Sequence, residues 1–268
     1  MVLPLRESAT GFCGPAGDRM MRTIVLATQK GGSGKSTLAM GLAVAAQQAG
    51  EIVRLIETDP QGTLSYWQSC RGLAEPLVEP IQQPADIGRR LDAFARGGVT
   101  LAVIDTSSGI NELTRAAIEQ ADLCLVPARP CVADIIASAP TVKIIRASHR
   151  RFAFVLNQAP HRGPRASEAA NALCHNDRDL ADVVAKPLVT LRNDHQDALA
   201  AGLGVTEFHA SGKSASEIRL LWQWVETRLI EGDESRMRLS PRTERHSLRT
   251  NPVATSANEA SSSWDAGL

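Results

Sequence analysis

The sequence predicts an α/β fold with a doubly wound, mainly parallel sheet and helices on both of its faces. Short apolar runs, typical of buried strands, alternate along the chain with longer stretches of helical character. One of these runs leads into a glycine-rich turn that opens directly into a helix. Apolar residues make up 43% of the 268 residues, which is enough to fill a sizeable core.

The alternation places the elements in order along the chain. Strands are expected at 23–27, 53–57, 101–105, 123–127 and 152–157. Helices are expected at 35–49, 84–96, 112–120, 132–148, 165–176, 193–201 and 214–230. Because each strand is followed by a helix, consecutive strands are expected to run parallel.

Three regions differ in composition. Residues 1–21 are punctuated by glycine and proline, and we expect a flexible N-terminal extension there. Residues 22–231 contain all of the predicted elements and are expected to form one domain. From 232 to 268 Asp, Glu, Ser, Arg, Asn and Thr dominate, so this segment is expected to be a disordered polar tail.

Bulk properties exclude several classes of protein. The 29 basic and 29 acidic residues cancel, so the overall charge does not point to a nucleic-acid coat protein. The five cysteines have no CxxC spacing, which argues against a disulfide framework and against a zinc site. No apolar run approaches the roughly 20 residues needed to cross a membrane, and the N-terminus is unlike a secretory signal. We therefore expect a cytoplasmic protein.

The glycine-rich turn predicts a phosphate-binding loop. It consists of the consecutive residues Lys30, Gly31, Gly32, Ser33, Gly34, Lys35, Ser36 and Thr37. Glycines let successive backbone N–H groups converge on one anion, and the N-terminus of the following helix adds unpaired donors. We expect Lys35 to reach the β- and γ-phosphates of ATP, Ser36 to bind Mg²⁺, and Thr37 to approach the α-phosphate.

Two carboxylates follow predicted strands. Asp105 ends the apolar strand at 101–105, and Asp59 comes just after the strand at 53–57. In doubly wound sheets ligands bind at the carboxyl ends of the strands. We expect Asp105 to hold Mg²⁺ through a water molecule. For Asp59, a turn residue before a proline is the alternative to a functional role.

The loop from Lys30 to Thr37 resembles the deviant Walker A motif of the ParA/MinD superfamily of P-loop ATPases. The resemblance spans about 22–230 and is greatest to small, plasmid-type ParA partition proteins. It implies that Lys30 reaches across a homodimer to the phosphates bound by the partner. It also implies catalytic roles for Lys30, Lys35 and Asp59, with Asp59 orienting the attacking water and contacting the metal shell.

Two departures from the family pattern bear on the switch segments. Glu57-Thr-Asp59-Pro-Gln-Gly62 resembles the D-x-D-P-Q-G switch, with Glu57 in place of the first Asp. Ser107-Ser108 follows Asp105-Thr106 where the family usually has Pro-Pro. The second departure bears on the hydrolysis rate.

The same resemblance suggests residues for the base and for DNA. Asn157 matches an adenine-contacting Asn, although an Asn that simply closes a strand is the alternative. By resemblance, Arg192, Lys213 and Arg219 are candidates for non-specific DNA contact. From 135 to 167 there is no Asp or Glu while basic residues accumulate; this stretch is either a second DNA-facing surface or a solvated face. Its basic residues are Lys143, Arg146, Arg150, Arg151, Arg162 and Arg165.

The resemblance implies a ParA-type ATPase that partitions plasmid or chromosomal DNA. Binding of Mg²⁺ and ATP drives dimerisation and DNA binding on the nucleoid, and a ParB-like centromere-binding protein stimulates an intrinsically slow hydrolysis. One alternative is a VirC1-like, ATP-binding DNA-recruitment adaptor with weak or no hydrolysis. Another is a MinD-like membrane-positioning ATPase, which is disfavoured because 232–268 contain no sustained apolar stripe.

Overall fold

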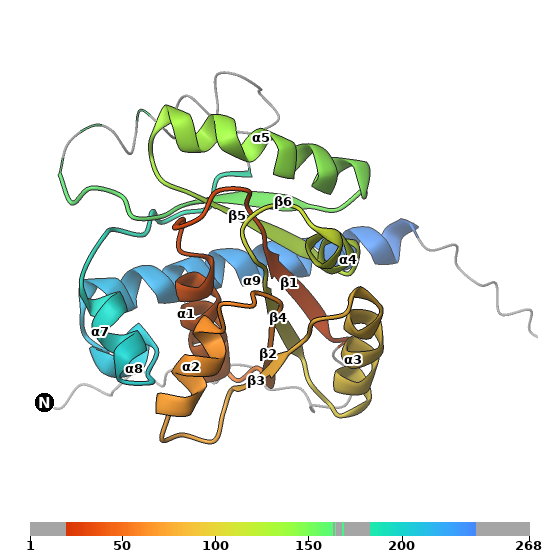
Figure 1. The fold of residues 1–268 in the computed structure, drawn as a ribbon, viewed down its shortest axis with the longest axis horizontal. Coiled ribbons are helices and arrows are strands. Elements are labelled where there is room, and N and C mark those ends of the chain that lie inside the picture. Colours follow the sequence, from red (N-terminus) through yellow and green to blue (C-terminus); the bar gives the residue numbers. More distant parts are fainter. Residues whose placement is uncertain (1–19, 163, 165–167, 169–182, 240–268) are drawn as a thin grey trace, which may run out of the picture.

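A single parallel sheet lies at the centre of the fold, with helices on both faces (Figure 1). The computed structural model describes residues 20–162, 164, 168 and 183–239. The six strands are ordered β3-β2-β4-β1-β5-β6, and each neighbouring pair is parallel. Their bounds are β1 Arg22–Leu26, β2 Val53–Glu57, β3 Leu77–Pro80, β4 Leu101–Asp105, β5 Leu123–Ala128 and β6 Phe152–Leu156. The predicted doubly wound, parallel fold is confirmed.

The helices divide between the two faces of the sheet. Their bounds are α1 Lys35–Gln48, α2 Thr63–Cys70, α3 Pro84–Arg96, α4 Glu112–Glu119, α5 Val132–Ala147, α7 Asp194–Ala200, α8 Val205–Phe208 and α9 Lys213–Leu239. One apolar core joins the sheet to α1, α2 and α9, and the other joins it to α3, α4 and α5. Alternate residues of β1 show the division, because Ile24 belongs to the first core and Val25 to the second.

Three short elements were not predicted from the sequence. Strand β3 has four residues, lies at the edge of the sheet and ends in a proline, so its apolar signal is weak. Helix α2 has eight residues, of which only Leu64 and Trp67 are buried. Helix α8 has four residues. Each is too short for a periodic pattern to stand out.

The last helix corrects one predicted boundary. The disordered tail was expected to begin at 232, but α9 continues to Leu239. Extending an existing helix needs no new nucleus, so polar residues can continue it without burying an apolar face. The segment 240–268, most of 1–21 and all but residue 168 of the predicted helix at 165–176 lie outside the described residues. In the part of the chain that is described, no helix combines the length and apolar composition needed to cross a bilayer.

Candidate functional site

The glycine-rich loop leaves β1 at the carboxyl edge of the sheet and opens helix α1 (Figure 1). Gly32 and Gly34 have φ angles of 73° and 87°, which favour glycine. A Cβ atom at Gly34 would lie 2.2 Å from Nδ2 of Asn157. Gly34 is therefore required both by its backbone conformation and by the space around it.

Two amides from the end of β6 hold the loop by its carbonyl oxygens. Asn157 Nδ2 donates to Ser33 O at 2.8 Å, and Gln158 Nε2 donates to Gly32 O at 3.0 Å. Within the described residues, the backbone N–H groups of residues 31–34 make no hydrogen bond. Unpaired N–H groups at a glycine-rich turn before a helix fit an anion such as a phosphate. The predicted adenine contact of Asn157 stays a prediction, since its amide nitrogen is bound to the loop.

Lys35 lies at the first position of α1 with only 6% of its surface exposed. Its Nζ donates to Ser108 Oγ at 3.2 Å. Burial lowers the pKa of Lys35, while the nearby carboxylates of Asp105 and Asp59 oppose this shift. A buried ammonium beside a ring of unpaired N–H groups is suited to an oxyanion.

Asp105 ends β4 and is completely buried, in register with Leu26 on one side and Glu57 on the other. Neither of its carboxylate oxygens has a hydrogen-bond partner among the described residues. Burial raises the pKa of Asp105 to about 7, although the Ser36 hydroxyl and the Lys35 ammonium oppose that rise. An unpartnered buried carboxylate is costly by itself and fits a hydrated divalent cation.

Asp59 follows β2 at the same edge and is partly buried. Its Oδ1 accepts from the backbone N–H of Gln61 at 3.0 Å, which forms a local turn. The preceding residue, Thr58, donates from both its backbone N and its Oγ1 to Asp105 O, at 2.9 and 3.1 Å. These bonds fix the end of β2 to the end of β4, so the two predicted metal carboxylates lie at adjoining strand ends.

Glu57 has a structural role that the sequence did not reveal. Its side chain is buried and accepts from Leu64 N at 2.6 Å and from Ser65 N at 3.1 Å. It also accepts from the Ser65 hydroxyl. Glu57 therefore satisfies the first donors of helix α2, which has no side-chain cap of its own.

Lys30 points to α5. Its Nζ is paired with Oδ1 of Asp134, which is 3% exposed and lies in the first turn of α5. Arg129 Nε donates to the other oxygen of Asp134 at 2.8 Å. Burial alone would raise the pKa of Asp134, but the bonds from Arg129, Lys30 and Cys131 hold it well below its usual range. Asp134 was not predicted from the sequence. The feature that could have indicated it is an acidic residue in the first turn of the helix that follows Arg129.

Ser108 occupies the position where the ParA/MinD pattern usually has the second proline. Besides its bond to Lys35, its Oγ would lie 3.4 Å from a Cβ atom at Gly31. Ser107 Oγ accepts from Asn111 Nδ2 at 3.0 Å. Ser108 thus puts a hydroxyl group beside the glycine-rich loop, and Ser107 puts one at the start of α4, where a prolyl pair would have none.

The residues predicted to contact DNA lie just before α7 and in the first part of α9. Arg192 forms a two-point pair with Glu217, at 2.7 and 2.9 Å. Arg219 donates to the carbonyl oxygens of Ala210 and Thr206. Lys213 is exposed at the first position of α9. Two of the three side chains therefore make internal contacts that anchor the C-terminal part of the domain.

Known proteins resemble this chain in sequence and in fold. A model of the CobQ/CobB/MinD/ParA nucleotide binding domain matches residues 24–219. Maintenance of carboxysome distribution protein A of Gloeobacter kilaueensis is 30% identical over 200 residues, which cover 73% of this chain and 88% of that protein. Protein ParA of Rhizobium radiobacter is 28% identical over 127 residues, covering 47% and 56%. The septum site-determining protein MinD of Pyrococcus horikoshii, complexed with Mg-ADP, has a TM-score of 0.61 and 16% identity, with 77% of this chain and 96% of that chain covered.

Proposed function

The chain belongs to the CobQ/CobB/MinD/ParA family of nucleotide-binding P-loop ATPases, and from that premise we propose that it is a ParA-type partition ATPase. Mg²⁺ and ATP join two copies into a homodimer, and the dimer binds DNA without sequence preference. A ParB-like centromere-binding partner stimulates hydrolysis, which releases the DNA and moves the cargo. In this proposal the protein acts in the cytoplasm, on the nucleoid.

The observation that carries the proposal is a set of buried or unpartnered polar groups at one edge of the sheet. The N–H groups of residues 31–34, the buried ammonium of Lys35 and the buried carboxylate of Asp105 all lie there. The triphosphate of a nucleotide would accept hydrogen bonds from the N–H groups and from the Lys35 ammonium. The Asp105 carboxylate would bind Mg²⁺. Ser36, Asp59 and Asp105 are the residues that would hold the ion, which would neutralise charge on the phosphates.

Lys30 supports the dimeric form of the site. Its ammonium is bound to Asp134 on α5, whereas Lys35 contacts Ser108 beside the loop. The two ammonium groups therefore lie at different places. Only that of Lys35 lies beside the proposed phosphate-binding loop of its own chain. A second cation supplied by a partner subunit would stabilise the charge that develops on the γ-phosphate, as an arginine finger does.

Asp59 is placed to act on water. Its side chain is partly exposed at the strand edge that carries Asp105, and the Gln61 turn holds one of its oxygens. In our proposal the other oxygen orients the attacking water toward the γ-phosphate. Removing this carboxylate should block hydrolysis while leaving nucleotide binding in place.

The mass of the protein in solution tests the proposal. Asp59→Ala is expected to be a dimer with Mg²⁺ and ATP and a monomer with ADP, measured by light scattering after gel filtration. The matched control, Lys35→Ala, should remain monomeric with either nucleotide because the phosphate cradle is lost. A monomer for Asp59→Ala under saturating Mg·ATP would contradict the proposed dimer.

Two observations favour variants of this function. The relative from Gloeobacter kilaueensis is named for carboxysome distribution, so the cargo carried over DNA can be a protein compartment. Ser108 replaces the proline of the second switch and binds Lys35, which favours slow turnover and the VirC1-like adaptor. Pull-down of candidate cargo proteins with the purified chain tests whether the cargo is a protein compartment. Undetectable phosphate release with DNA and a cognate partner would favour the second.

A further inference from the structure

Ser108 presents an unused hydroxyl hydrogen beside the glycine-rich loop. Its Oγ accepts from Lys35 Nζ at 3.2 Å and would lie 3.4 Å from a Cβ atom at Gly31. Among the residues that the structure describes, the Ser108 hydroxyl donates to no acceptor. A hydroxyl can accept one hydrogen bond while it donates another. The O–H of Ser108 is therefore available to an oxyanion that Lys35 also binds.

The segment that carries Ser108 is anchored on both sides. Thr106 Oγ1 donates to Leu26 O at 2.8 Å, which fixes the segment to the end of β1. Asn111 Oδ1 accepts from Thr114 N at 2.7 Å, which caps α4 and fixes the other side. Ser108 lies between these two anchors and is itself exposed. Contacts of the protein itself thus hold the hydroxyl beside the loop, as a positioned donor requires.

The direction of a triphosphate along the loop brings its last phosphate toward Ser108. Thr37 is expected at the α-phosphate and Lys35 at the β- and γ-phosphates, so the phosphates run from α1 toward the start of the loop. Gly31 lies at that start, and the Ser108 hydroxyl is next to it. A γ-phosphate oxygen that accepts from Lys35 would be within hydrogen-bond reach of the Ser108 O–H.

We propose that Ser108 donates a hydrogen bond to the γ-phosphate of ATP and makes the site prefer ATP over ADP. This inference rests on the proposed function, because it requires that the loop binds Mg·ATP. ADP has no γ-phosphate, so the contact stabilises only the complex with ATP. The proline that the family pattern usually has at this position has no O–H and no N–H to donate. The contact is therefore a property of this chain and not of the motif.

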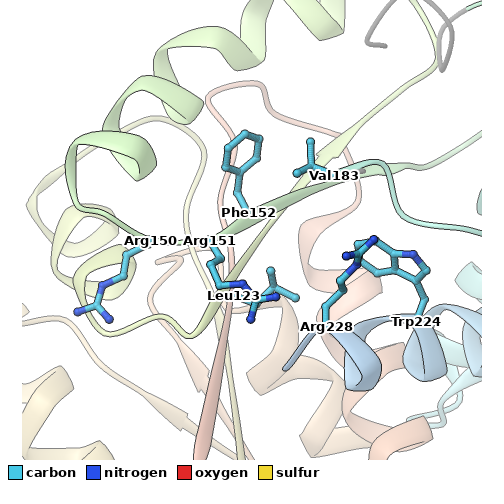
Figure 2. A pocket seen from close by; sticks show the side chains of 7 residues that line it. All are labelled: Leu123, Arg150, Arg151, Phe152, Val183, Trp224 and Arg228. Carbon is cyan, nitrogen blue, oxygen red and sulfur yellow. The ribbon is translucent and has the colours of Figure 1, made fainter. Parts of the chain in front are cut away.

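A pocket at the opposite edge of the sheet has polar groups that are already engaged (Figure 2). It lies between the starts of β5 and β6 and helix α9, and its volume is about 290 Å³. Arg150 Nη1 donates to Ala121 O at 3.3 Å, and Arg228 lies over the indole of Trp224, at 5.1 Å from the ring centroid. These guanidiniums make contacts within the protein, whereas the Ser108 O–H is left for a ligand.

Titration calorimetry on the full chain tests the proposal. The probes are the non-hydrolysable β,γ-imido analogue of ATP and ADP, both with Mg²⁺. Ser108→Ala should weaken binding of the ATP analogue about tenfold, because a hydrogen bond to a charged group is lost. Its affinity for ADP should stay within about twofold of the wild type, since ADP does not use this contact. The preference for the triphosphate should therefore fall about tenfold.

Two matched variants accompany Ser108→Ala. Ser107→Ala removes the same group one position earlier, where the hydroxyl accepts from Asn111 at the start of α4. It should leave the preference for the triphosphate unchanged. Ser108→Thr keeps a hydroxyl at the same place and should retain the preference within about threefold. Loss of the preference in Ser107→Ala to the same extent would overturn the assignment to Ser108.

A purely structural role of Ser108 predicts a different pattern. If Ser108 only holds the Lys35 ammonium, its removal changes the affinities for the ATP analogue and for ADP by the same factor, because Lys35 reaches the β-phosphate of both. An unchanged preference in Ser108→Ala would therefore overturn the proposal. Phosphorus resonances of the bound analogue give a second readout. The γ-phosphorus should shift in Ser108→Ala, and a shift of the α-phosphorus alone would also overturn the proposal.

The same titrations in the Lys30→Gln background separate this contact from dimerisation. That background is expected to stay monomeric, so the loss caused by Ser108→Ala should persist there. Its disappearance would overturn the proposal, because Ser108 would then act through the dimer. Failure of the proposed function looks different. A wild type that binds the ATP analogue without dimerising would contradict the partition cycle, while the preference for the triphosphate would still decide the role of Ser108. A wild type that takes up neither nucleotide would overturn both.

Discussion

Lys30 and Lys35 stand on one loop, yet their ammonium groups have different partners. Lys35 is buried next to Ser108, and Lys30 is held by Asp134 on α5. Because only Lys35 faces the loop of its own chain, the two lysines should contribute to different steps. Lys35 should decide whether ATP binds, and Lys30 should decide whether two ATP-bound subunits dimerise and hydrolyse it.

Lys30→Gln tests this division. The variant should bind Mg·ATP within about threefold of the wild type, because its own cradle is intact. It should lose ATP-dependent dimers, and stimulated hydrolysis should fall at least about 100-fold, as expected for a lost cation at the γ-phosphate. Isothermal titration and phosphate release measure the two effects. Wild-type behaviour in both assays would remove the role of Lys30 in the partner's site.

Asp105 makes the stability of the metal-free protein depend on pH. Its pKa in the folded state is about 7, above the ordinary value for an aspartate, so the folded state binds more protons than the unfolded chain between about pH 4 and pH 7. The free energy of unfolding should therefore fall as the pH rises through this window, by an amount on the order of 4 kcal/mol.

Urea unfolding with EDTA at pH 5 and pH 8 measures this effect. Asp105→Asn should remove most of the difference, since the asparagine does not titrate. A wild-type protein whose stability rises between these pH values in parallel with that of Asp105→Asn would contradict the assignment.

At the scale of single elements, α2 depends on a carboxylate that lies outside it. Glu57 of β2 accepts from the N–H groups of Leu64 and Ser65 and from the Ser65 hydroxyl. Glu57→Gln should lower the free energy of unfolding by about 1–2 kcal/mol, because the helix loses a charged acceptor at its N-terminus. Thermal unfolding measures this, with Glu119→Gln as control, because Glu119 is an exposed carboxylate at the end of α4. Equal melting temperatures for the two variants would contradict it.

The elements that the sequence predicted are those with strong local signals. Strands such as β4 are continuous apolar runs, and α1 begins where the glycines end. Strand β3 and helix α2 were not predicted because they are short, and because side chains outside each element stabilise them: Glu57 for α2 and Gln68 for β3. Helix α9 ran past the predicted boundary because helix extension needs no apolar stripe.

The residues of the functional site also divide into those that local sequence signals predict and those that they do not. Lys35, Asp59 and Asp105 could be predicted, because strand–turn–helix order places them at one edge of the sheet. Asp134 and Arg129 could not, since the pairing of Lys30 with Asp134 joins residues 104 positions apart.

At the scale of the whole molecule, the carboxyl edge of the sheet carries the groups proposed for Mg·ATP. Intrinsic hydrolysis should be slow, well under about one turnover per second, because a lone subunit lacks the partner's Lys30. Phosphate release should rise with protein concentration as dimers form. A fast rate that does not depend on concentration would contradict hydrolysis by a dimer.

The central claim is that the loop from Lys30 to Thr37 is a cradle for Mg²⁺ and ATP, and titration calorimetry tests it most directly. The folded wild type should take up ATP in the presence of Mg²⁺ and bind it much more weakly with EDTA. Lys35→Ala should show no uptake while keeping the far-ultraviolet circular dichroism of the wild type. Absence of Mg²⁺-dependent uptake by the wild type, or unchanged affinity in Lys35→Ala, would contradict the claim.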